Sequence, residues 1–162
     1  MTPQDSSPGT AHPHVLTTSS FADERSRVLK HGDTFAVFDH HGRIKPGGLG
    51  EEGLYHEGTR FLSRYLIELE DTALIVLGSN VRGENGHLAV ALTNPDLIAE
   101  GKLRLSFGTL HVAVKTFLWK SVCYQQIRVK NYGPRAMTAS LSLHFSADYA
   151  DIFEIRGMKR KA

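Results

Sequence analysis

Carboxylates are the side chains of this sequence that could cleave a glycosidic bond. They gather in a glycine-rich stretch and after the last apolar run: Glu51, Glu52 and Glu57, then Asp148, Asp151 and Glu154. Such hydrolysis needs two carboxyl groups facing one cleft, roughly 5–10 Å apart. Residues three apart in a regular strand point to opposite faces, so Asp151 and Glu154 are not predicted to form an acid–base pair. A β-bulge, which would bring both groups to one face, is the alternative.

Neither the glycine-rich loop nor the single cysteine indicates a cofactor, and we expect no metal site and no catalytic nucleophile. The glycines at 47, 48 and 50 lack the GxxxxGK[ST] pattern and the strand–turn–helix context of a phosphate-binding loop. Cys123 is the single cysteine, so an internal disulfide is excluded. It shares a face with Ile127 and Val129 in an alternating stretch, which indicates a small core residue.

Aromatic side chains offer a second kind of chemistry, because an exposed ring can stack on the apolar face of a sugar. Trp119 lies in the turn region Phe117–Lys120 and Tyr55 follows the glycine-rich loop. We take both as candidate carbohydrate contacts, with core or interface packing as the alternative.

Composition places these residues in one domain of ordinary globular character. The chain has 162 residues, a hydrophobic fraction of 41% and a net charge of +2. That charge predicts no nucleic-acid partner, and the sequence has neither a membrane-length apolar run nor a signal peptide, so we expect a cytoplasmic protein. Residues 1–20 are polar and aperiodic, which predicts a disordered tail before a domain at 21–162.

Alternating apolar residues predict that strands position the candidate side chains. The expected strands are 34–38, 61–70, 73–80, 87–93, 110–118, 121–130 and 137–147, with 73–80 buried. The segment 21–30 is expected to form a short helical turn or to lie along the surface. Short turns between the strands, such as Asp39–Gly42, imply antiparallel pairing, and one apolar face per strand implies two packed sheets. The predicted fold is therefore all-β, an antiparallel β-sandwich.

Seven segments together resemble the N-terminal domain of bacterial glycogen debranching enzymes, the amylo-α-1,6-glucosidase-like proteins. They are LKHGDTF at 29–35, GLYH at 53–56, TRFLSR at 59–64, LTNPD at 92–96, FLW at 117–119, RVKNY at 128–132 and ADIFEIRG at 150–157. The resemblance implies a supersandwich-like β-sandwich placed before an α-helical toroid that carries the catalytic acids. Gly58 stands where many relatives carry aspartate, which weakens any role for that loop. The family domain continues with further strands where this chain ends at Ala162, so we expect an incomplete sandwich.

The resemblance implies a non-catalytic domain that packs against a separate catalytic toroid and shapes its cleft. Asp151, Glu154 and Arg156 are the candidate interface residues, because charged groups in the apolar stretch DIFEIRG, read here as a strand, need partners. A solvent-facing role is the alternative. Missing strands would leave an unpaired edge, so we also expect self-association or marginal stability.

Two further functions stand beside the packing domain. A free-standing α-glucan-binding module would use Trp119 or Tyr55, and an independent enzyme would need a carboxylate pair in one pocket.

Overall fold

A computed structural model describes residues 26–45, 50–83 and 86–157. The predicted tail at 1–20, most of the glycine-rich loop and most of the turn at 84–86 lie outside these ranges. The elements run in chain order as β1 (Arg27–His31), β2 (Thr34–Phe38), β3 (Gly53–His56), β4 (Thr59–Leu62), β5 (Arg64–Leu69), β6 (Thr72–Ala73), β7 (Ile75–Arg82), β8 (His87–Thr93), β9 (Leu97–Ala99), β10 (Lys102–Leu105), β11 (Leu110–Trp119), β12 (Val122–Asn131), β13 (Leu141–Ser146) and α1 (Ile152–Ile155).

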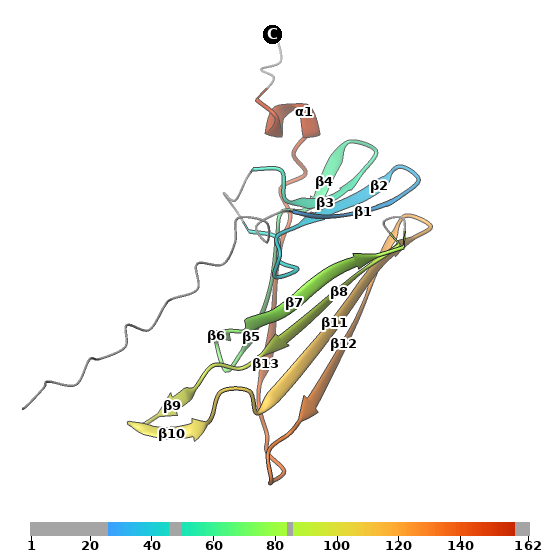
Figure 1. The fold of residues 1–162 in the computed structure, drawn as a ribbon. Coiled ribbons are helices and arrows are strands. Elements are labelled where there is room, and N and C mark those ends of the chain that lie inside the picture. The colour runs from blue at the N-terminus through green and yellow to red at the C-terminus, as the bar shows by residue number, and fades with distance from the viewer. Residues whose placement is uncertain (1–25, 46–49, 84–85, 158–162) are drawn as a thin grey trace, which may run out of the picture.

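The strands form antiparallel sheets, which confirms the predicted all-β class (Figure 1). One sheet has the order β12-β11-β8-β7 and a second has the order β13-β5-β6. The sheet β1-β2-β3-β4 lies at one end of these two sheets. Strands β9 and β10 form a separate two-stranded ribbon. The bridge between Ile44 and Tyr65 joins the segment after β2 to β5.

The predicted alternation on the two central strands of the large sheet is confirmed. Leu88, Val90 and Leu92 of β8 are each at most 4% exposed, and the matching row of β11 is also buried. These rows pack against buried residues from the other sheets: Leu29, Ala36, Phe38, Ile44, Tyr65, Ile67 and Leu69. Burying this apolar surface is the main favourable contribution to folding.

The predicted turn at Asp39–Gly42 is confirmed, and it joins the small sheet to the core. The Asp39 carboxylate accepts hydrogen bonds from the backbone N–H groups of His41 and Arg43, each at 2.8 Å. Gly42 has a φ of +72°, and a Cβ there would lie 2.9 Å from Cγ2 of Val90. Positive φ and close packing therefore both require glycine at this position.

Four sequence predictions need correction. The segment 21–30 is not a helical turn where it is described, because Arg27–His31 is a strand paired with β2. The strand predicted at 61–70 divides at Ser63 into β4 and β5. The segment 73–80 is buried only at Leu74 and is otherwise half-buried or exposed, because β7 forms the edge of its sheet. The strand predicted at 137–147 begins at Leu141, and its apolar row is largely exposed.

Candidate interaction surfaces

An apolar groove of about 430 Å³ separates β5 and β13 from β11 and β12. Its lining includes Leu62, Tyr65, Cys123, Ile127, Leu143 and Phe145. The Tyr65 hydroxyl donates to Oε1 of Gln125, whose Nε2 donates to Thr116 Oγ1 at 3.0 Å, so polar groups span the groove. Burial raises the pKa of the Tyr65 phenol, and it raises the pKa of the Cys123 thiol to about 11. Cys123 is therefore protonated at neutral pH, as expected for a packing residue rather than a nucleophile.

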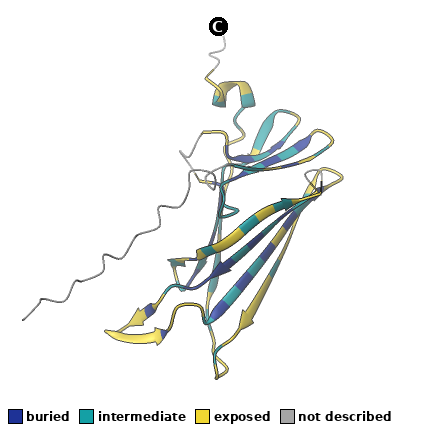
Figure 2. Ribbon diagram, viewed as in Figure 1, coloured by how far each residue is buried: buried dark blue, intermediate teal, exposed yellow. Residues whose placement is uncertain are grey.

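The two strands beside this groove are edge strands. β12 and β13 each end the strand order of their sheets, and each pairs with one neighbour in the described part of the chain. The side chains of β12 are mostly exposed, as Figure 2 shows by its yellow colour, and those of β13 are half-buried or exposed. An unpaired edge presents free N–H and C=O groups to any strand that can lie beside it.

Aromatic rings extend the apolar surface away from the groove. Phe145 is 60% exposed and lies 5.4 Å from the ring of Tyr65, centroid to centroid. Phe61 is 46% exposed and contacts Tyr149 edge to face at 5.8 Å. We call the set Phe61, Leu143, Phe145 and Tyr149 the apolar rim, and such an exposed patch beside a groove is typical of an interaction site.

The two predicted aromatic contact residues differ in their surroundings. Trp119 ends β11 and its ring centroid lies 4.8 Å from that of His31. The side chain is 52% exposed, so it meets the requirement of an accessible ring for sugar stacking. The predicted exposure of Tyr55 is wrong, because its side chain is 1% exposed. Its ring stacks on Phe35 at 4.6 Å and its hydroxyl donates to the Glu51 carbonyl. Tyr55 therefore presents no free ring face to a sugar.

The strand predicted for the DIFEIRG segment is also wrong. Ile152–Ile155 forms a single helical turn, and the Asp151 carboxylate caps it by accepting from the backbone N–H of Phe153 at 2.8 Å. Aspartate at this position satisfies an otherwise unpaired helix N–H, which favours a helical turn over a strand in this segment. Glu154 is exposed, and Arg156 Nε lies 3.3 Å from the Glu51 carboxylate. The three predicted interface residues thus lie together beside the loop before β3.

Sequence reasoning missed the residue that anchors this end of the chain. Arg60 on β4 forms a two-pronged ion pair with the carboxylate of Asp148. Its Nη1 also donates to the carbonyls of Gly50 and Glu52 at 3.4 and 3.3 Å. The hydrogen bond from Arg60 lowers the pKa of Asp148, so this carboxylate is ionised at neutral pH and is no proton donor there.

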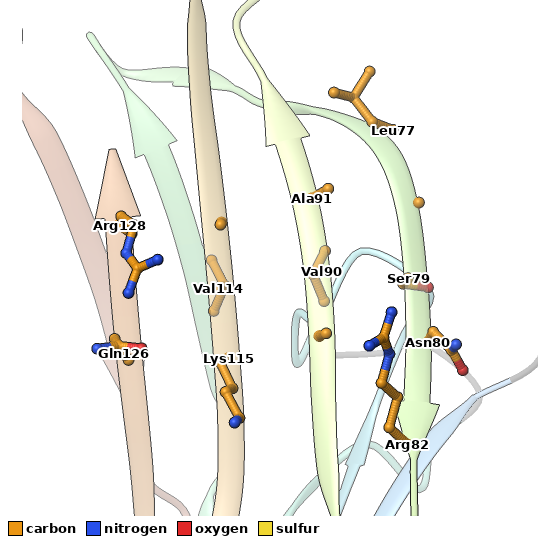
Figure 3. Close-up of a pocket in the computed structure, with 13 residues that line it drawn as sticks. Leu77, Ser79, Asn80, Arg82, Val90, Ala91, Val114, Lys115, Gln126 and Arg128 are labelled. Atoms are coloured by element: carbon orange, nitrogen blue, oxygen red, sulfur yellow. The ribbon is translucent and has the colours of Figure 1, made fainter. Parts of the chain in front are cut away.

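A second surface that sequence reasoning missed is a hollow of about 580 Å³ on the outer face of the β7-β8-β11-β12 sheet (Figure 3). Its floor consists of small residues from three strands: Gly78, Ala89, Ala91 and Ala113. Arg82 on β7 and Arg128 on β12 stand on opposite sides of this floor. The signal was present in the sequence as alanine at alternate positions, but no pattern indicated which strands are neighbours.

Comparison with protein families decides the class of this domain. The sequence model of the N-terminal domain of (some) glycogen debranching enzymes matches residues 29–162. The chain belongs to this family. The match covers the whole sandwich except the first two residues of β1, and it confirms the resemblance predicted from the seven segments. No curated protein and no solved structure matches the chain.

Within residues 26–45, 50–83 and 86–157, no three His, Cys, Asp or Glu side chains are placed to hold a metal ion together. In the same ranges, no helix has the length and apolar character needed to cross a membrane.

Proposed function

We propose that this domain is a non-catalytic part of a debranching enzyme, which packs against a separate catalytic domain through the apolar groove and its rim. The observation that carries the proposal is the unpartnered apolar surface between β12 and β13. Phe145 and Leu143 are 60% and 43% exposed although they belong to an alternating apolar strand. A strand with that pattern normally buries one face, so the exposed face marks a contact with another domain.

The segment that contains Asp151, Glu154 and Arg156 supports the same location. The backbone of Arg60, on β4, donates to the Ala150 carbonyl at 2.9 Å, and the Ile152 N–H donates to the Gly58 carbonyl at 2.9 Å. The segment is therefore fixed to the β3–β4 hairpin, next to the rim residues Phe61 and Tyr149. Exposed Glu154 and Arg156 then form a polar border to an apolar contact, as is usual in interfaces between proteins.

The second candidate is a stand-alone α-glucan-binding module, favoured by the half-exposed ring of Trp119. Family membership is compatible with both functions, because a fold supports many activities. The two proposals use different surfaces, since Trp119 lies at the far end of β11 on the outer face, and the rim lies on the inner side.

Binding to the catalytic domain of the same organism's debranching enzyme, produced as a separate polypeptide, tests the packing function. Isothermal calorimetry of the two purified parts is expected to show saturable 1:1 binding. Phe145→Asp is expected to weaken it at least about tenfold, because it places a charge in a desolvated contact, whereas Trp119→Ala is the matched control and leaves it unchanged. No binding at 100 µM of both parts would contradict the proposal.

A parallel titration with glycogen and maltodextrins separates the second candidate. The packing function predicts no heat of binding that depends on Trp119. Saturable binding at millimolar sugar, lost in Trp119→Ala and kept in Phe145→Asp, would instead assign the domain to glucan binding. We further propose, from the sequence features given above, that the protein acts in the cytoplasm.

A further inference from the structure

The outer sheet face that contains the small-residue floor has an unusual charge distribution. Strands β7, β8, β11 and β12 contain no aspartate or glutamate, but they contain four cationic residues: Arg82, Lys115, Arg128 and Lys130. The complete chain is almost balanced, with 19 Lys and Arg against 17 Asp and Glu. Positive charge is therefore concentrated on this sheet.

The strand register places three of these cations, Arg82, Lys115 and Arg128, around one hollow. Ala113 on β11 lies opposite Ala91 on β8 and opposite Arg128 on β12, and Lys115 lies opposite Gln126 of β12. On the other side, Gly78 of β7 lies opposite Ala91. Figure 3 shows the guanidinium groups of Arg82 and Arg128 leaning from the two outer strands toward the floor between them.

Three of these cations, Arg82, Lys115 and Arg128, have no partner within the described part of the chain, whereas Lys130 lies over the ring of Tyr132. Arg82, Lys115 and Arg128 are exposed, and none forms an ion pair or a side-chain hydrogen bond with another residue in the described part of the chain. Like charges on one face repel each other, so the face becomes more stable when an anion lies between them. Arginine on both sides suits phosphate in particular, because its planar guanidinium donates two parallel hydrogen bonds to phosphate oxygens.

We propose that this outer face binds an α-glucan chain that carries phosphate monoesters. The glucan part rests on the membership of the debranching-enzyme family, and the phosphate part rests on the cations. The alanine and glycine residues of the floor let a sugar ring approach the sheet closely, and the amides of Asn80 and Gln126 can bond to hydroxyls on either side. The groove proposed for packing lies on the opposite face of the same sheet, so both surfaces can be occupied together.

Calorimetric titration of the full chain with a phosphorylated maltodextrin, and with an unphosphorylated one of equal length, tests the proposal. The phosphorylated chain is expected to bind about tenfold tighter or more, with an affinity that falls as salt is raised. Arg82→Gln and Arg128→Gln are each expected to weaken its binding about fivefold or more. Arg104→Gln, on β10 of the separate ribbon, is the matched control and is expected to have no effect. Thermal melts would verify that all variants fold.

Three outcomes would overturn the proposal. Equal affinity for both dextrins would remove the role of the phosphate, and binding of inorganic phosphate as tight as that of the phosphorylated dextrin would remove the role of the glucan. Tighter binding of a single-stranded oligonucleotide of equal charge would assign the face to a nucleic acid instead. Phe145→Asp is expected to leave phosphodextrin binding unchanged, so a failure of the packing function and a failure of this proposal are distinguishable.

Discussion

The guanidinium of Arg60 on β4 holds the carboxylate of Asp148, which lies 88 residues later in the sequence. This pair ties the segment after β13 to the β3–β4 hairpin, and it thereby positions the Asp151 cap and α1. The Arg60 side chain is 16% exposed and that of Asp148 is 37% exposed. Partial burial and two hydrogen bonds make the pair stronger than an ordinary surface ion pair.

Replacing Arg60 by glutamine is expected to lower the free energy of unfolding by about 1 kcal/mol, after allowing for solvent screening at Asp148. The matched control is Arg156→Gln, whose pair with Glu51 is more than half exposed and should contribute less than about 0.5 kcal/mol. Urea unfolding monitored by fluorescence measures both. Equal effects of the two substitutions would show that the Arg60–Asp148 pair is no anchor.

Acid should weaken the fold through His41. Burial, followed by the nearby positive charge of Arg43, lowers the pKa of His41 from 6.5 to about 4. The unfolded chain therefore takes up a proton near pH 6.5 and the folded chain only near pH 4, so stability falls as the pH is lowered between these values. Urea unfolding at a series of pH values should give a shallower decline for His41→Gln than for the unmodified chain. Parallel pH profiles would contradict the lowered pKa.

Two leucines in alternating strands should differ strongly when each is changed to alanine. Leu88 on β8 is 1% exposed, so Leu88→Ala leaves a cavity and is expected to cost about 2–4 kcal/mol. Leu143 on β13 is 43% exposed at the groove, so Leu143→Ala in the isolated chain is expected to cost less than about 1 kcal/mol. Chemical denaturation measures both. A large cost at Leu143 would mean that the groove is closed in solution.

Asn94 is a buried polar residue whose removal should be costly. Its side chain is 0% exposed, its Nδ2 donates to the carbonyls of Pro95 and Ser106, and its Oδ1 accepts from the Leu110 N–H at 2.7 Å. Asn94→Ala leaves the buried N–H of Leu110 without this partner and is expected to lower the free energy of unfolding by about 1–3 kcal/mol. Thermal unfolding would show the loss as a lower midpoint, and an unchanged midpoint would show that water replaces the side chain.

The alternation of apolar residues was sufficient to predict the strands whose apolar face is buried in the core. β8 matches the predicted 87–93, and both strand 34–38 and the turn at Gly42 were predicted correctly. Alternation fails as a guide at sheet edges, because it indicates which face is apolar but not whether that face is covered. β7 and β13 are apolar in sequence but exposed in the structure for this reason.

The candidate site was predicted less completely than the fold. Asp151, Glu154 and Arg156 do lie together, but on a capped helical turn rather than on a strand, because Asp151 satisfies the first free N–H. Tyr55 is buried by Phe35, which lies 20 positions away in the sequence, and no local pattern shows such a contact. The anchoring role of Arg60 and the cationic outer face were not predicted, because both depend on which strands lie next to each other.

The sequence by itself determined the class of this protein: an all-β domain of the debranching-enzyme family, with its main core rows on β8 and β11. Periodicity and turn chemistry suffice for this, since they act over a few neighbouring residues. The tertiary structure alone decided which surfaces remain open. Pairing brings Arg82 and Arg128 to two sides of one alanine floor and leaves β12 and β13 at edges, because strand order arises from contacts between residues distant in sequence.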